Sequence, residues 1–180
     1  CRALTGLVRG ELLLYGSTPP PAGAWYEPAA GNTYKICWNL PGFTEELISS
    51  DRIKLRGKHN LLNIAAAALA AGKAGADRET IVQAIAGYNG LEHRLEYVTT
   101  IDGVQYFDDS FATAPEPTIV ALRAFTEPVI LIAGGVDKGA DYWPLAEEII
   151  AGSVKAVVLI GKMAPVLREI ITRLGLEKGR

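Results

Sequence analysis

Two adjacent carboxylates follow an apolar stretch in the segment YFDDSFATAPEP, residues 106–117. Asp108 and Asp109 end the stretch, and the hydroxyl side chains of Ser110 and Thr113 follow directly. Acids and hydroxyls at the end of a strand can bind a polar or charged ligand, because binding residues concentrate in loops on a rigid scaffold. The alternative is that Asp109 and Ser110 cap the helix expected next, since both residue types favour that position.

Two further apolar runs, each expected to form a strand, are followed by charged residues. PVILIAGG is followed by Asp137 and Lys138, and VKAVVLIG is followed by Lys162. Ligands of open parallel sheets bind at the carboxyl ends of the strands, so we expect these groups at the same edge as Asp109. Ammonium groups beside a carboxylate and hydroxyls would suit a polar or anionic ligand.

Two carboxamides share a face of the helix expected in GKHNLLN. Asn60 and Asn63 are three residues apart, which places them together on a helix beside His59. Each amide offers a donor and an acceptor, so the pair can bind a nucleobase or phosphate-bound water. The alternative is that both are capping and turn residues.

A histidine and an arginine lie in LEHRLE, next to an expected domain joint. Arg94 can bind a phosphate with two parallel hydrogen bonds, or it can pair with Glu92 or Glu96 at the surface. His93 is too isolated from His59 in sequence for the spacing to predict a metal site. We therefore predict no metal ligands.

Common signatures of catalysis and targeting are absent from the sequence. There is no G-x-x-x-x-G-K-[ST] phosphate loop, no G-x-G-x-x-G after a strand and no arguable nucleophile triad. The formal net charge of −2 excludes a strongly basic nucleic-acid binder. No apolar run reaches the roughly 20 residues that span a bilayer. Cys1 and Cys37 fit no metal motif, so we expect reduced thiols in a cytoplasmic protein.

The elements that position these residues follow from hydrophobic pattern and turn residues. Residues 1–56 are expected to be irregular β structure, with a strand at 11–17 and a hairpin turning at Ala29–Asn32. Helices are expected from His59 to Gly72 or Gly75, and after the cap residue Asp77.

The second half alternates strands with helices. A hairpin with Asp102-Gly103 at its turn is followed by helices near 116–125, 142–151 and 163–174. The intervening apolar strands are typical of a buried parallel sheet. This order predicts an α/β fold with a doubly wound sheet, and a domain boundary near residue 90.

Four motifs, taken in order, resemble the Mur ligases of peptidoglycan synthesis. They are GKHNLLNIAAAALAA, GLEHRLEYV, FDDSFATAPEPTIVAL and ILIAGGVDKG. The third motif is similar to that of members that add D-glutamate to UDP-N-acetylmuramoyl-L-alanine. Siblings that add other amino acids, folylpolyglutamate-type ligases and a non-catalytic nucleotide-binding module remain alternatives.

The resemblance implies an assignment of domains and partners. Residues 1–90 would be the C-terminal portion of a central ATP-binding domain, and 91–180 a truncated Rossmann-like C-terminal ligase domain. The family's phosphate loop would lie upstream, so the chain is expected to be a fragment that is inactive alone. The implied cofactors are ATP and Mg²⁺, in a monomer that acts on small molecules and engages neither nucleic acid nor membrane.

The resemblance also implies residue roles. Asn60 and Asn63 match positions that contact ATP, and Arg94 and Asp109 match catalytic positions that engage the nucleotide. Thr113 and Lys138 match family positions that hold D-glutamate, and Ser110 is placed beside them.

Two residues depart from the family pattern. Phe111 occupies a position where many members have lysine, and Ala114 one where many have asparagine. The identity of the added amino acid is the expectation that these departures affect most.

Overall fold

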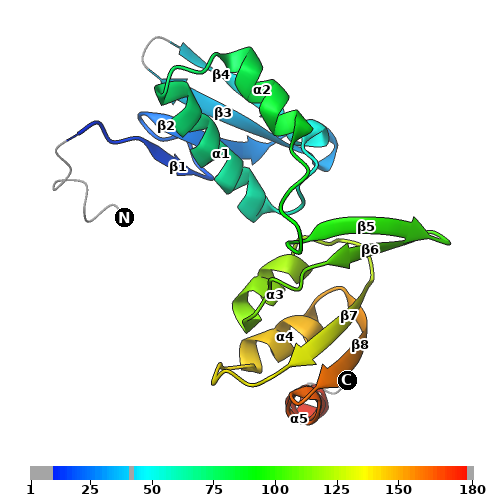
Figure 1. The fold of residues 1–180 in the computed structure, drawn as a ribbon. Coiled ribbons are helices and arrows are strands. Elements are labelled where there is room, and N and C mark those ends of the chain that lie inside the picture. Colours follow the sequence, from blue (N-terminus) through cyan, green and yellow to red (C-terminus); the bar gives the residue numbers. More distant parts are fainter. Residues whose placement is uncertain (1–9, 41–42, 178–180) are drawn as a thin grey trace. The chain divides into compact units, whose positions relative to one another are not determined.

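The computed structural model describes residues 10–40 and 43–177, so Cys1 lies outside the described residues. The chain divides into two compact units, residues 1–89 and 90–180 (Figure 1). Each unit has its own sheet structure and its own apolar core. That these units correspond to the two domains implied by the resemblance remains a prediction.

The first unit is built on a four-stranded sheet in the order β1-β2-β3-β4. Its strands are β1 (Leu14–Gly16), β2 (Gly23–Pro28), β3 (Tyr34–Leu40) and β4 (Phe43–Ser49). The pair β1–β2 is parallel, and the other two pairs are antiparallel. The predicted hairpin is confirmed: β2 and β3 are joined by the short 3-10 helix η2 (Ala30–Asn32), where Gly31 has a φ of 68°. A second 3-10 turn, η3 (Ser50–Arg52), follows β4.

Two helices pack on this sheet. They are α1 (Lys58–Lys73) and α2 (Arg78–Gly87), and both confirm the predicted segments. Alanine and leucine favour helix in α1, and their small or flexible side chains allow close packing. The core joins strand residues such as Ile36 and Trp38 to helix residues such as Ala65 and Leu69.

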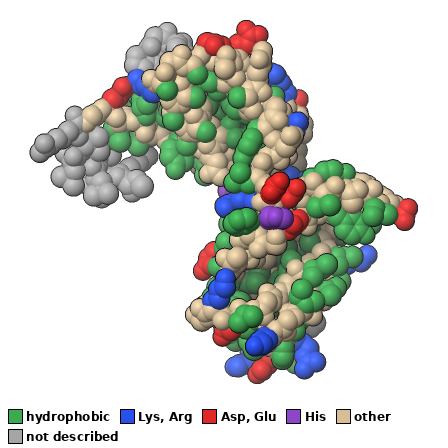
Figure 2. Space-filling view, viewed as in Figure 1, with side chains coloured by type: hydrophobic (Ala, Val, Ile, Leu, Met, Phe, Trp, Pro, Cys, Tyr) green, Lys and Arg blue, Asp and Glu red, His purple; other side chains and the backbone are tan. Residues whose placement is uncertain are grey.

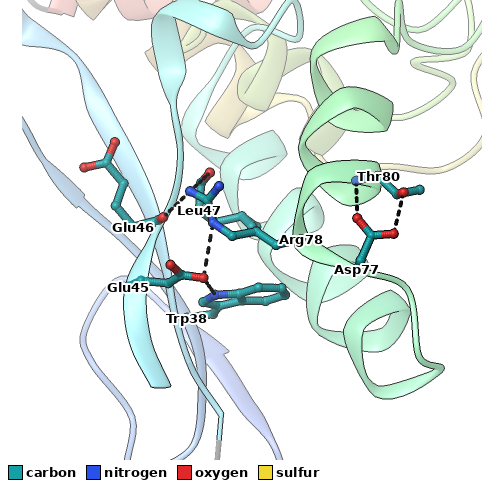
Figure 3. A network of polar contacts seen from close by, with 7 residues as sticks. All are labelled: Trp38, Glu45, Glu46, Leu47, Asp77, Arg78 and Thr80. Atoms are coloured by element: carbon teal, nitrogen blue, oxygen red, sulfur yellow. Dashed lines mark hydrogen bonds and ion pairs between the residues drawn. The ribbon is translucent and has the colours of Figure 1, made fainter. Parts of the chain in front are cut away.

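A polar network fastens the start of α2 to β4 (Figure 3). Asp77 caps the helix as predicted, accepting hydrogen bonds from the backbone N–H and the hydroxyl of Thr80 at 2.9 and 2.7 Å. Arg78 reaches the carbonyl of Glu46 at 2.8 Å and the carboxylate of Glu45 at 3.1 Å. The indole of Trp38 donates to the same Glu45 carboxylate at 3.3 Å, which ties the buried ring to the surface network.

The second unit begins with a separate hairpin and continues with a β-α-β unit. The hairpin pairs β5 (Glu96–Ile101) with β6 (Val104–Asp108), and its turn residues Asp102 and Gly103 have φ values of 50° and 78°. These values confirm the predicted turn. The elements that follow are α3 (Pro115–Leu122), β7 (Val129–Gly135), α4 (Trp143–Ala151), β8 (Val154–Gly161) and α5 (Ala164–Glu177).

The parallel pairing of β7 with β8 is confirmed, but two expectations for this sheet are wrong. In the described part of the chain β6 pairs with β5 alone, so the three strand ends do not belong to one hydrogen-bonded sheet. The strands are also not buried on both faces. Inward residues such as Leu131 pack on helix residues such as Leu145, whereas Ile130 and Ile132 are 63% and 66% exposed. Apolar side chains accordingly appear at the surface of this unit (Figure 2).

Two further observations bear on the sequence expectations. Cys37 is a buried free thiol whose pKa is raised by burial. Among the described residues, no helix combines the length and the apolar character that a membrane span requires.

Candidate functional site

A strained turn in the second unit presents Arg94. The residues on either side of it, His93 and Leu95, have φ values of 61° and 46°. This left-handed region is uncommon for residues other than glycine, because the Cβ atom crowds the backbone. Such a conformation persists only where surrounding contacts hold it, and it concentrates at functional sites.

The segment after β6 supplies those contacts. The Asp108 carboxylate lies 2.8 Å from His93 Nδ1, and the Asp109 carboxylate accepts the Leu95 backbone N–H at 3.0 Å. The backbone N–H of Phe111 donates to the His93 carbonyl at 3.0 Å, and the Phe111 ring stacks on the imidazole with a centroid separation of 6.2 Å. Both adjacent acids therefore bind one short turn that lies 14 or 15 residues earlier in the chain.

Arg94 has no ion-pair partner within the part of the chain that the structure describes. Its side chain is exposed. The alternative of a surface pair with Glu96 is not what the structure contains, because that carboxylate accepts the His93 backbone N–H at 2.7 Å. Glu92, the other candidate partner, forms no ion pair with Arg94 either. The guanidinium is thus available for an anionic ligand.

The electrostatics of the turn follow from the His93–Asp108 pair. The hydrogen bond to Asp108 raises the pKa of His93 above its usual value, and the nearby charges of Glu96 and Glu92 act in the same direction. The same hydrogen bond, with that from the Ser110 backbone, lowers the pKa of Asp108 to about 2. Because an ionised carboxylate only accepts hydrogen bonds, His93 Nδ1 carries a proton in this pair.

The capping alternative for Asp109 and Ser110 is wrong. Helix α3 begins after Ala114 and has no side-chain cap, while two prolines occupy its first turn. Ser110 donates its backbone N–H to Asp108 at 2.9 Å, and its side chain is exposed. The Ser110 side chain also hydrogen-bonds the Asp108 carboxylate. Thr113 is exposed and lies four residues after Asp109.

The two carboxamides of the first unit lie together, as predicted. Asn60 donates to the Arg56 carbonyl at 2.7 Å, which closes the turn before α1, and Asn63 donates to Asn60 Oδ1 at 3.3 Å. Asn60 therefore has the structural role that the alternative proposed, although the helix N-cap itself is Gly57. Asn63 is exposed, and its carbonyl oxygen accepts no hydrogen bond from the described residues. His59 is half-buried beside them.

The charged residues after β7 and β8 lie in exposed loops. Asp137 accepts the Gly139 backbone N–H at 2.8 Å and so orders the loop that carries Lys138. Lys138 and Lys162 are exposed. The Met163 backbone N–H donates to the Gly135 carbonyl at 3.0 Å, which joins the two loops at their bases. Within the described structure, no contact joins Lys138 to Thr113 or Ser110.

Sequence spacing did not predict the group formed by His93, Glu96 and Asp108. Their nitrogen and oxygen atoms lie within 4.8 Å of one another, a spacing found in some metal sites. Here the carboxylates already accept hydrogen bonds from the imidazole and from backbone N–H groups. The group is satisfied as a hydrogen-bonded clasp, and we define the clasp by these three residues together with Asp109.

The clasp could have been anticipated only in part. Asp108 and Asp109 stood out as adjacent acids, but a charged residue such as Glu96 in a strand is usually a solvated side chain. The signal that joins them to residues 93–95 is the antiparallel register, in which Glu96 pairs with Asp108.

Comparison with known proteins gives sequence relatives that are named as D-glutamate-adding ligases. The chain is 34% identical over 174 residues to a UDP-N-acetylmuramoylalanine–D-glutamate ligase of Symbiobacterium thermophilum, a match that covers 97% of this chain and 38% of the relative. A ligase of the same name from a Roseiflexus species is 49% identical over 126 residues, or 69% of this chain and 27% of the relative. The chain thus spans about a third of the length of these relatives. No model of a known protein family matches it.

Solved structures agree on the fold. A MurF ligase of Acinetobacter baumannii superposes with a TM-score of 0.65 at 17% identity, covering 88% of this chain and 35% of that one. A MurF ligase of Thermotoga maritima solved in complex with ADP has a TM-score of 0.52 at 16% identity, covering 92% of this chain and 49% of that one. From sequence and fold together, the chain belongs to the Mur ligase family.

Proposed function

We propose that this chain is part of an ATP-dependent ligase that joins D-glutamate to UDP-N-acetylmuramoyl-L-alanine in peptidoglycan synthesis. The observation that carries the proposal is the 34% identity, over 97% of the chain, to a ligase named for that reaction. The ADP bound to the Thermotoga MurF ligase is in accord with nucleotide use. Both substrates and ATP are solutes of the cytoplasm, which is the proposed location.

The reaction has two steps whose atoms balance. A carboxylate oxygen of the UDP-linked acceptor attacks the γ-phosphorus of ATP, ADP leaves, and an acyl phosphate forms. The neutral amine of D-glutamate then attacks the acyl carbon and the acyl C–O bond breaks. An amide forms as the nitrogen loses a proton, and phosphate leaves with one former carboxylate oxygen. Positioning of the reactants and neutralisation of phosphate charge dominate catalysis of this kind.

The residues of this chain are proposed to bind and orient the reactants. The Arg94 guanidinium, which has no ion-pair partner among the described residues, suits a phosphate. Asp109 is proposed to hold the turn that carries Arg94 and to engage the nucleotide. Asn63, with Asn60 behind it, offers its exposed carboxamide to the adenine. The Lys138 ammonium suits a carboxylate of D-glutamate, with the hydroxyls of Thr113 and Ser110 as further donors.

Mg²⁺ is proposed to enter with the nucleotide and to neutralise its phosphates. Mg²⁺ prefers oxygen ligands in octahedral geometry. The His93–Glu96–Asp108 group does not fit this preference, because it includes an imidazole and its carboxylates are engaged. We therefore assign no described residue to Mg²⁺.

A sibling ligase with another amino-acid substrate is the second candidate. The observation that favours it is Phe111, which is 65% exposed and places an aromatic ring where many members have lysine. Ala114 removes the amide that many members carry at its position.

The test is phosphate release from ATP by a ligase of full length that contains this sequence. UDP-N-acetylmuramoyl-L-alanine is supplied with D-glutamate, L-lysine, meso-diaminopimelate or D-Ala-D-Ala in separate reactions. We expect release with D-glutamate alone. Release with another amino acid would support the sibling ligase, and no release with any of them would leave a nucleotide-binding module as the better account.

A further inference from the structure

We propose that His93 and Asp108 are positioning residues, which hold the turn at residues 93–95 so that the Arg94 guanidinium is presented in one direction and kept free of the surrounding acids. The inference rests on the proposed role of Arg94 in binding the nucleotide. It adds two residues to that site that touch no substrate and act through the backbone of the turn.

The backbone of the turn needs contacts from outside the turn to hold it. Both neighbours of Arg94 adopt left-handed φ values although neither is glycine. A leucine in this region has no polar side chain with which to offset the crowding. The contacts of the clasp must therefore supply what the local sequence does not.

The contacts of the clasp hold the turn on both sides of Arg94. His93 is held at three atoms: its N–H by Glu96 at 2.7 Å, its Nδ1 by Asp108 at 2.8 Å and its carbonyl by the Phe111 N–H at 3.0 Å. Leu95 is held at its N–H by Asp109 at 3.0 Å. Arg94 lies between two fixed residues, so the direction in which its side chain leaves the backbone is also fixed.

The charges around the turn favour the same role. The acids that act on His93 are Asp108, Glu96 and Glu92, and the arginine beside it carries the opposite sign. The imidazole is hydrogen-bonded to the Asp108 carboxylate, and the His93 backbone N–H donates to the Glu96 carboxylate. A carboxylate released from the clasp would be a competing partner for Arg94. The clasp thus both orients the guanidinium and keeps it available for a phosphate.

The test compares four variants of the full-length ligase, with the KM for ATP and kcat measured separately. His93→Ala and Asp108→Asn are expected to raise the KM for ATP about tenfold, the ratio that corresponds to one charge-assisted hydrogen bond. The kcat is expected to change little. His93→Asn should restore most, but not all, of the KM lost in His93→Ala. Its amide can donate where Nδ1 does and asparagine tolerates the left-handed region, but the amide lacks the charge of the imidazolium. Asp102→Asn, at the other end of the same hairpin, is the control and should match wild type.

The pH profile distinguishes positioning from a merely structural role. The KM of the wild-type enzyme for ATP should rise as the pH passes above the pKa of His93, whereas His93→Asn should lack this rise. Failure of His93→Asn to restore the KM, or a wild-type KM in His93→Ala, would overturn the inference.

Two further measurements separate this inference from the proposed function. If Arg94→Ala leaves the KM for ATP unchanged, the proposed role of Arg94 fails, and the positioning role fails with it. The clasp itself is read from backbone NMR shifts of residues 93–95 in this 180-residue chain. Unchanged shifts in His93→Ala would refute the clasp even if Arg94 proves essential.

Discussion

His93 and Asp108 form an ion pair at the surface whose two pKa values move apart. The pKa of His93 is raised, and that of Asp108 is lowered to about 2. A group with a raised folded pKa contributes stability that is fully present below its unfolded value of about 6.5 and is lost as the pH rises through the folded pKa. A group with a lowered pKa contributes stability above its unfolded value, which is lost as the pH falls toward about 2.

The chain should therefore be most stabilised by this pair between roughly pH 4 and 6.5. We expect urea midpoints measured across pH to decline on both sides of that window, by a small amount because both groups are solvent-exposed. In His93→Asn the decline on the alkaline side should be reduced. An unchanged alkaline decline in that variant would assign it to other groups.

Lys138 provides a prediction about substrate binding. Lys138→Ala in the full-length ligase should raise the KM for D-glutamate about tenfold, because a carboxylate would lose a charge-assisted hydrogen bond. Lys155→Ala removes another exposed lysine of the same unit and serves as the control. An equal effect of both substitutions on the KM would indicate a general electrostatic contribution and no specific contact.

The residues that could bind a ligand could be picked out from the sequence, but the residues that they contact could not. Adjacent acids, paired carboxamides and an arginine at a joint are visible as letters. That Asp109 holds Leu95, and so does not cap a helix, depends on a hairpin register that brings together residues 14 positions apart. Local propensity carries no information about such a contact.

The β7–β8 pair is one-sided among the described elements, and neighbouring residues of β7 test this directly. Leu131 packs on the helices, whereas Ile132 is 66% exposed. Leu131→Ala should cost roughly 2 kcal/mol in this chain through lost burial and a residual cavity. Ile132→Ala should stay within about 0.5 kcal/mol of wild type. Equal losses in chemical denaturation would mean that the outer face is covered.

Gly134 allows β7 to approach β8. Its φ is 156°, and a Cβ atom at this position would lie 1.8 Å from the Ile160 carbonyl oxygen. Gly134→Ala should therefore cost more than about 2 kcal/mol by forcing the strands apart. Gly87→Ala is the control, since open space surrounds that glycine, and it should stabilise by about 0.4–1 kcal/mol. Similar melting temperatures for the two variants would contradict this account.

The existence of the elements was more predictable than their pairing. Alanine-rich α1, the Asp77 cap and the Asp102-Gly103 turn depend on local physics, and all three are confirmed. The apolar run of β7 resembles a strand buried on both faces, because hydrophobicity alone does not say which face the helices cover. Separate pairing of β5 and β6 likewise depends on tertiary context.

At the scale of the molecule, each of the two units contributes residues with proposed roles. The first contributes the carboxamides of α1, and the second contributes the clasp and the loop that carries Lys138. Membership of the Mur ligase family follows from relatives of which the chain spans about a third. The reaction of the whole ligase therefore stands as a proposal, with phosphoryl and acyl transfer as its two steps.

One isotope measurement tests that claim most directly. UDP-N-acetylmuramoyl-L-alanine labelled with ¹⁸O in its carboxylate is incubated with ATP, D-glutamate and a full-length ligase containing this sequence. The account predicts an amide product whose mass has increased by one D-glutamate residue, together with inorganic phosphate that carries one ¹⁸O atom. Unlabelled phosphate, or product formation that does not require D-glutamate, would contradict it.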